Sequence, residues 1–210
     1  MGCPLYLKTD IMALVSSYVQ TQREGNGEQL NVRTIIVGNR LILREMTPED
    51  FAALSRVLSD PDVMRHYPRP FDAAEVRAWI ARNIERYRVL GFGLWAVCLK
   101  ETGAVIGDCG LTMQNIDGLI CPEIGYHIRK DQQGKGYAKE AAAAVLDWAF
   151  ENTPFQTLFS YCKYTNAPSC ATAASIGMRF IKEFADEVNT YTRVYAITKS
   201  EWLRQKSGNR

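Results

Sequence analysis

Residues 121–150 read CPEIGYHIRKDQQGKGYAKEAAAAVLDWAF, and this stretch decides the fold of the 210-residue chain. Its first part alternates between two faces, as a strand does. One face carries Ile124, Tyr126 and Ile128, and the other carries Glu123, Gly125 and His127. After the turn Gly134-Lys135-Gly136, apolar residues recur at helical spacing from Ala138 to Ala149. The stretch therefore predicts a strand, a tight glycine turn and a long helix.

The glycine turn is a candidate anion site. A helix that begins directly after such a turn leaves its first N–H groups unpaired and carries the positive end of the helix dipole. Phosphate is the usual ligand of such a helix start. A glycine pair can also be a simple turn, because the chain lacks the third glycine of a dinucleotide fingerprint and has no GxxxxGK[ST].

The residues around the turn resemble a known family. Gly134-Lys135-Gly136-Tyr137-Ala138 after Glu-Ile-Gly-Tyr is similar to the acyl-CoA pyrophosphate loop of the GNAT superfamily of N-acetyltransferases. The resemblance is closest to the branch that acetylates ribosomal-protein N-termini and related amines. Asp131 stands where the family has Gln or Arg. Asn166-x-x-Ser169 followed by Gly177 resembles a second family segment, in which Met178 replaces the usual Phe.

The rest of the chain predicts the elements of an α/β fold in the order of that family. We expect strands at 40–44, 92–99, 105–113, 123–128, 157–164, 178–184 and 191–197, with helices at 48–58, from residue 73, from 137 and from 167. The resemblance implies an α+β sheet of six to seven strands, mixed but mostly antiparallel and flanked by helices. It also implies that the fourth and fifth strands splay apart.

The domain organisation is expected to be simple. Residues 1–31 form an N-terminal extension with a short helix and a linker, residues 32–204 form the acetyltransferase domain, and residues 205–210 form a polar tail.

Composition excludes several classes of function. The net charge is +2 with no basic run, so nucleic acid is not an expected partner. Six scattered cysteines without CxxC spacing indicate reduced thiols in the cytoplasm rather than a disulfide framework, and no metal is expected. No apolar run is long enough to span a membrane, so no membrane partner is expected.

The resemblance implies where acetyl-CoA binds. Its pantetheine arm would lie along the backbone of Tyr126, His127 and Ile128, and an amide near Ile128 would polarise the thioester carbonyl. The cofactor-binding set that this implies is Tyr126, His127, Ile128, Gln133, Gly134, Lys135, Gly136, Tyr137, Ala138, Asn166 and Ser169. Lys135 either adds charge to this site or is a solvated surface residue.

Glu123 and Ser169 are the candidate catalytic residues. Glu123 shares a strand face with Gly125, which leaves open space beside it, so Glu123 is the candidate base. The resemblance implies that a glutamate at this place acts through water. The alternative is an exposed strand residue or an ion pair. Ser169 is either the acid for the departing thiolate or a helix cap.

These observations predict an acetyl-CoA-dependent N-acetyltransferase that acts by direct transfer in a ternary complex. The acceptor is a primary amine, either a protein N-terminus or a small molecule such as an antibiotic or polyamine. A non-catalytic acyl-CoA sensor is the alternative of a different class. The sequence leaves the acceptor and the choice between monomer and homodimer open.

Overall fold

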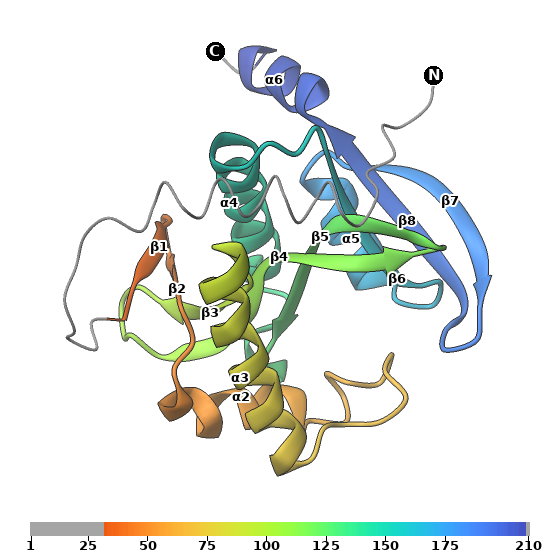
Figure 1. Cartoon of the computed structure of the whole chain (residues 1–210). Coiled ribbons are helices and arrows are strands. Elements are labelled where there is room, and N and C mark those ends of the chain that lie inside the picture. The colour runs from red at the N-terminus through yellow and green to blue at the C-terminus, as the bar shows by residue number, and fades with distance from the viewer. Residues whose placement is uncertain (1–31, 209–210) are drawn as a thin grey trace.

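A computed structural model describes residues 32–208 of the chain, so the expected helix and linker of residues 1–31 lie outside the described residues. Eight strands form one sheet in the order β1-β2-β3-β4-β5-β6-β8-β7 (Figure 1). Neighbouring strands pair antiparallel except β5 and β6, which pair in parallel. The predicted mixed, mostly antiparallel sheet is confirmed.

The elements follow the predicted order. The strands are β1 (Thr34–Val37), β2 (Leu41–Arg44), β3 (Leu94–Leu99), β4 (Val105–Ile116), β5 (Leu119–Ile128), β6 (Thr157–Lys163), β7 (Arg179–Asp186) and β8 (Thr190–Thr198). The helices are η1 (Pro48–Asp50), α2 (Phe51–Leu58), α3 (Ala73–Leu90), η2 (Lys130–Gln132), α4 (Tyr137–Asn152), α5 (Ala167–Ser175) and α6 (Lys199–Gly208). No helix among residues 32–208 is long and apolar enough to cross a membrane.

Two elements were not predicted. β1 is a four-residue edge strand whose ends are exposed, so its sequence carries no alternation of buried and exposed residues. α6 includes residues 205–208, which we expected to belong to a polar tail. The indole of Trp202 fixes α6 to α4 by donating to Asp147 Oδ1 at 2.7 Å, a contact between residues distant in sequence.

The spacing of Thr47 with Asp50 and of Asp72 with Glu75 predicts two helix starts on the N-terminal side, and both form. The N–H of Thr47 donates to the carboxylate of Asp50 at 2.9 Å. Asp72 and Glu75 exchange backbone-to-carboxylate hydrogen bonds of 2.8 and 2.9 Å at the first turn of α3. Both pairs satisfy N–H groups that a helix start otherwise leaves unpaired.

The sheet separates two apolar cores, because successive side chains of a strand point to opposite faces. On β3, Trp95 and Val97 belong to the core that includes α4, whereas Leu94 and Ala96 belong to the core under α2 and α3. Figure 1 shows α2 and α3 together on one side of the sheet.

The α3 stripe departs from expectation at one position. Helical spacing predicts that Val76, Ile80 and Ile84 lie on the buried face of α3. Val76 and Ile80 are buried, but Ile84 is 36% exposed, and the preceding residue, Asn83, is fully buried instead. The amide of Asn83 accepts from the N–H of Leu94 and donates to the carbonyl of Trp79, both at 3.0 Å. These bonds offset the cost of burying a polar side chain.

The splay predicted between the fourth and fifth expected strands is confirmed between β5 and β6. Within the described chain, Glu123 and Phe159 are the one register pair that joins these two strands. β6 then pairs along its whole length with β8. The sheet therefore forks immediately beyond Glu123 and leaves the C-terminal half of β5 with an open edge.

Candidate active site

A cleft with a volume of about 460 Å³ occupies the fork of the sheet. Its lining runs from the glycine turn at Gln133 and Gly134, along β5, to Tyr161 on β6. The loop between α2 and α3 closes one side, and the β7–β8 turn contributes Val188 and Asn189. Four segments distant in sequence therefore meet at this cleft: β5 with its glycine turn, β6, the α2–α3 loop and the β7–β8 turn.

The glycine turn has the conformation that an anion site requires. Gly134 and Gly136 have φ angles of 75° and 82°, in the left-handed region that favours glycine. Gly136 immediately precedes α4, and the side-chain amide of Gln133 donates to the carbonyl of Ile128 at 2.9 Å. The turn is thus tied to the end of β5 and presents the start of α4 to the cleft.

Lys135 lies outside the cleft lining. Its ammonium group donates to Gln132 Oε1 at 3.0 Å on the exposed side of the turn. Its carbonyl accepts from Arg40, whose guanidinium also pairs with Glu140 at 2.7 Å. These contacts favour the interpretation of Lys135 as a solvated surface residue over a role in adding charge to the cofactor site. Arg40 was not predicted at this site, because it lies almost a hundred residues before the turn.

The backbone of β5 offers donors toward β6. The N–H of Arg129 donates to the carbonyl of Ile106 on the β4 side at 2.8 Å. Because successive residues in an antiparallel ladder direct their N–H groups to alternate sides, those of Ile128 and Tyr126 point toward β6. An extended ligand could therefore pair with this edge as a strand would.

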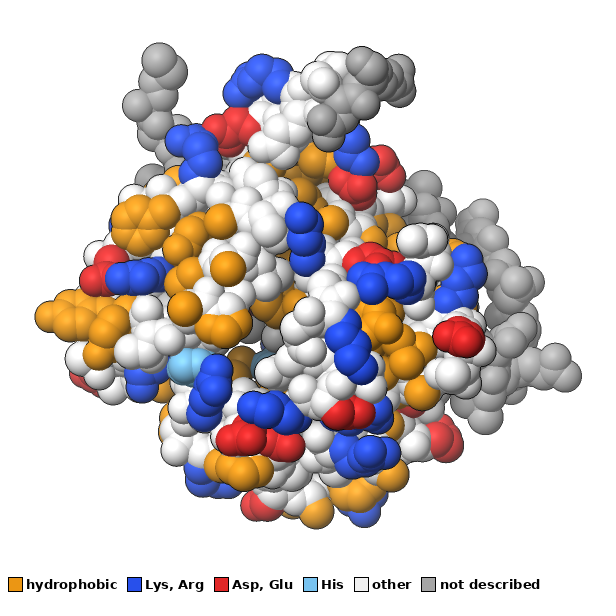
Figure 2. Space-filling view, turned by 180° about the vertical axis from the view of Figure 1, so that it is seen from behind, with side chains coloured by type: hydrophobic (Ala, Val, Ile, Leu, Met, Phe, Trp, Pro, Cys, Tyr) orange, Lys and Arg blue, Asp and Glu red, His pale blue; other side chains and the backbone are white. Residues whose placement is uncertain are grey.

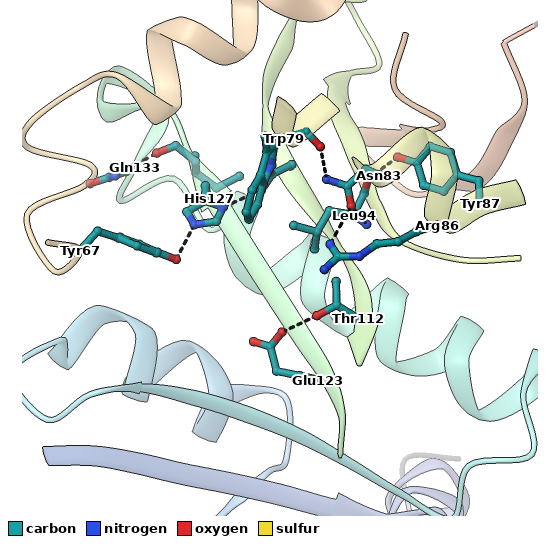
Figure 3. Close-up of polar contacts among 12 residues, drawn as sticks. Tyr67, Trp79, Asn83, Arg86, Tyr87, Leu94, Thr112, Glu123, His127 and Gln133 are labelled. Atoms are coloured by element: carbon teal, nitrogen blue, oxygen red, sulfur yellow. Dashed lines mark hydrogen bonds and ion pairs between the residues drawn. The ribbon is translucent and has the colours of Figure 1, made fainter. Parts of the chain in front are cut away.

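Glu123 is buried at the fork of the sheet. Its side chain is 8% exposed, and the hydroxyl of Thr112 donates to its carboxylate at 3.0 Å (Figure 3). Burial raises the pKa of Glu123 to about 7, although the Thr112 hydrogen bond and the charges of His127 and Arg86 act in the opposite direction. Near neutral pH this group can therefore both accept and release a proton. The alternative of an exposed strand residue is wrong.

Gly125 explains how the carboxylate of Glu123 reaches the cleft. A Cβ atom at this glycine would lie 3.1 Å from Glu123 Oε2. The missing side chain thus leaves the space into which the carboxylate extends, as the sequence predicted.

Ser169 does not cap its helix. Asn166 is the cap, since its side-chain oxygen accepts from the N–H of Ser169 at 3.2 Å. The hydroxyl of Ser169 instead lies 3.1 Å from the hydroxyl of Tyr126, which also donates to the Ser169 carbonyl at 3.0 Å. Burial raises the pKa of Tyr126, so its hydroxyl stays protonated. The sequence assigned only backbone contacts to Tyr126.

His127 is the centre of a polar cluster that the sequence did not reveal. Its Nδ1 lies 2.7 Å from Asp108 Oδ1, and its Nε2 lies 2.6 Å from the hydroxyl of Tyr67. Trp79 donates to the other oxygen of Asp108 at 2.8 Å. Asp108 faces His127 directly across the β4–β5 ladder, so a correct strand register would have predicted this contact. The contact with Tyr67 could not be predicted in this way, because Tyr67 lies in a loop.

The rim of the cleft is basic. Arg65, His66 and Lys163 line it, and burial together with the charges of Arg65 and Lys163 lowers the pKa of His66. Figure 2 shows basic side chains beside a histidine at the edge of a recess. Among residues 32–208, no group of three or more His, Cys, Asp or Glu side chains could hold a metal ion.

Comparison with known proteins adds a family to this geometry. Residues 40–179 match the model of the acetyltransferase (GNAT) domain. The uncharacterized protein YkkB of Bacillus subtilis (strain 168) is 36% identical over 154 residues, which are 73% of this chain and 90% of YkkB. The uncharacterized N-acetyltransferase YnaD of the same organism is 29% identical over 177 residues, which cover 80% of this chain and 98% of YnaD.

A solved structure shares the fold. RimL, a ribosomal L7/L12 alpha-N-protein acetyltransferase determined in complex with coenzyme A, superposes with a TM-score of 0.66 at 17% sequence identity. The similarity covers 79% of this chain and 98% of that structure. At this level of identity it shows a common fold.

Proposed function

The chain belongs to the GNAT acetyltransferase family, and from this premise we propose that it transfers an acetyl group from acetyl-CoA directly to a primary amine in a ternary complex. The observation that carries the proposal is the buried carboxylate of Glu123 at the fork of the sheet, beside an open strand edge and a glycine turn. An acyl-CoA, a base and space for an acceptor can meet at this point.

The residues of the cleft fit acetyl-CoA. The glycines of the turn and the start of α4 provide backbone N–H groups for the pyrophosphate, with no side chain in the way. The edge of β5 provides N–H groups at Tyr126 and Ile128 for an extended pantetheine arm. An N–H at Ile128 would stabilise the oxyanion that forms as the amine attacks the thioester carbonyl.

Glu123 acts as the base in this proposal. A group whose pKa is about 7 is close to the optimum for accepting a proton at neutral pH. It accepts a proton from the acceptor nitrogen through water, as the carbon–nitrogen bond forms and the carbon–sulfur bond breaks. Direct attack by the amine needs no acyl-enzyme intermediate.

The hydroxyl pair of Ser169 and Tyr126 is the candidate acid on the other side of β5. Their contact of 3.1 Å, together with the helix cap at Asn166, fixes the Ser169 hydroxyl at the cleft. The Ser169 hydroxyl would protonate the thiolate of CoA, and the Tyr126 hydroxyl would orient it.

The acceptor is proposed to be a weakly basic primary amine, such as a protein N-terminal α-amine or a small-molecule amine. An α-amine with a pKa near ~8 is partly neutral at neutral pH, whereas a lysine with a pKa near ~10.4 is not. The name of RimL, which shares the fold, supports the α-amine. A cytoplasmic location stays a prediction from the scattered spacing of the cysteines. Monomer or homodimer stays a prediction.

Turnover of acetyl-CoA with a panel of peptides and small amines tests this function. Release of CoA that depends on an amine, and that falls sharply in Glu123→Gln, is the expected result. Binding of acetyl-CoA without turnover of any amine would instead support the acyl-CoA sensor.

A further inference from the structure

A chain of hydrogen bonds connects three parts of the molecule beside Glu123. It begins at Asp108 on β4, continues through His127 on β5 and ends at Tyr67 in the loop between α2 and α3. Figure 3 shows the Tyr67 hydroxyl pointing to the imidazole of His127 on the sheet face that also carries Glu123. This chain shares no residue with the Ser169–Tyr126 pair, which joins α5 to β5.

The chemistry of the three groups fixes the direction of the hydrogen bonds. The carboxylate of Asp108 can only accept, so Nδ1 of His127 carries a proton. In the neutral imidazole Nε2 is then an acceptor, and the hydroxyl of Tyr67 donates to it. The Tyr67 oxygen can therefore accept a proton while the Tyr67 hydroxyl gives its own proton to Nε2 of His127.

The surroundings of the chain stabilise the imidazolium that forms when a proton reaches its centre. Asp108 is fully buried, and its second oxygen accepts from Trp79. Burial lowers the pKa of His127, but the charge and hydrogen bond of Asp108, followed by the charge of Glu123, raise it above the ordinary value. These two carboxylates and the neutral Tyr67 are the titratable groups that act on the imidazole from β4, β5 and the loop.

Tyr67 connects the inner end of the chain with solvent. Its hydroxyl is inside the cleft, where burial, followed by the charges of Glu123 and Asp108, raises its pKa. Its side chain as a whole is nevertheless 42% exposed. A proton held by this chain can thus return to water at the mouth of the cleft.

Acetylation of a protonated amine needs two proton acceptors. An ammonium group loses one proton before it can attack and a second as the amide forms. The reaction RNH₃⁺ + CH₃CO–S–CoA → RNH–COCH₃ + CoA–SH + H⁺ places one of them on sulfur and releases the other. The sulfur becomes a proton acceptor only after the carbon–sulfur bond breaks, whereas the ammonium must lose a proton before it can attack. Glu123 can accept only one of the two protons that leave the nitrogen, so the other needs another route.

We propose that Tyr67, His127 and Asp108 form a proton relay that deprotonates the ammonium form of the acceptor before attack. This proposal rests on the proposed function and deepens it. The Tyr67 oxygen accepts the ammonium proton while the Tyr67 proton passes to Nε2 of His127. The product is a neutral amine and an imidazolium that Asp108 stabilises. Tyr67 is a catalytic residue in this step, and Asp108 is a positioning residue.

The test uses two amines of nearly the same shape. One is a strongly basic primary amine that the wild type acetylates, and the other is its β,β,β-trifluorinated analogue, which is weakly basic and already neutral at neutral pH. Tyr67→Phe should lower kcat for the basic amine by about 10²-fold, a typical contribution of a positioned proton acceptor. The loss for the fluorinated amine should be at least about tenfold smaller, because that amine has no ammonium proton to remove.

Tyr164→Phe is the matched control, since this tyrosine lies outside the cleft lining and stacks edge-on against Tyr191. It should leave the rates with both amines unchanged. Equal losses for the two amines in Tyr67→Phe would overturn the relay, because a structural role does not distinguish amine basicity. A wild type that acetylates neither this amine nor any other of the panel would refute the proposed function itself.

The substitution Asp108→Asn provides a second test of the relay. The carboxamide can donate to Nδ1, so the proton of the neutral imidazole moves to Nε2, which can then no longer accept from Tyr67. The same selective loss with the basic amine is expected. A variant that keeps wild-type rates with the basic amine would contradict the role of Asp108.

Discussion

Glu123 and Phe159 pair in parallel at the point where β5 and β6 separate. The candidate base therefore lies at the last position where the sheet is continuous, and the open edge of β5 begins directly after it. This relationship places a proton acceptor beside the groove for an acyl-CoA.

Replacing Glu123 by Gln should lower kcat by about 10²–10⁴-fold, because it removes the proposed base and keeps the shape of the side chain. The affinity for acetyl-CoA should be unchanged, as measured by calorimetry. A variant that loses acetyl-CoA binding but keeps its turnover would mark Glu123 as a structural residue.

The rate should depend on pH through the same carboxylate. The base must be ionised, so kcat should rise with pH around the Glu123 pKa of about 7 and then level off. A pH–rate profile of the wild type checks this. The step should be absent from the residual activity of Glu123→Gln, and its persistence there would assign it to another group.

Glu123 should also reduce stability at alkaline pH. Its folded-state pKa is raised from 4.5 to about 7, so between these values the folded protein holds a proton that the unfolded chain has lost. Stability therefore falls as pH rises through this window, by up to about 3 kcal/mol. Glu123→Gln should unfold at a higher temperature than the wild type at alkaline pH, with a smaller difference below pH 4.5. Thermal melts at several pH values measure this.

Gly134→Asp should weaken acetyl-CoA binding far more than it destabilises the fold. A Cβ at Gly134 meets nothing within 4 Å, so the side chain fits, but its charge would repel the pyrophosphate. Gly103→Asp is a matched control in the β3–β4 turn, with a similar φ of 71° and equally open space. Both should lose similar stability, about 1–2 kcal/mol. Equal acetyl-CoA affinities in the two variants would contradict the predicted site.

Substitutions at Asn166 and Ser169 should have different effects, the first on stability and the second on turnover. Asn166→Ala removes the helix cap and should cost about 1 kcal/mol of unfolding free energy. Ser169→Ala leaves that cap in place and should lower turnover with little change in the melting temperature. A larger stability loss in Ser169→Ala than in Asn166→Ala would contradict this division of roles.

The sequence by itself determined the order of the elements and the core of the candidate site. Alternation placed Glu123, Gly125 and His127 on one face of β5, and the glycine turn fixed the start of α4, because these features depend on residues close together in the chain. The helix starts at Thr47 and Asp72 followed for the same reason.

Tertiary structure alone decided which distant residues meet. Tyr67 reaches His127 across 60 positions, Arg40 reaches Glu140 across 100, and Tyr126 reaches Ser169 across 43. The raised pKa of Glu123 could not be predicted from the sequence either, because burial at the fork causes it and the sequence does not show which residues surround the carboxylate. The sequence left Ser169 open between an acid and a cap, and only the tertiary structure shows that Asn166 is the cap and that a strand from another part of the chain holds the Ser169 hydroxyl. The periodicity of apolar residues indicates only the local structure of a segment, whereas the packing of the whole sheet determines which distant residues its side chains contact.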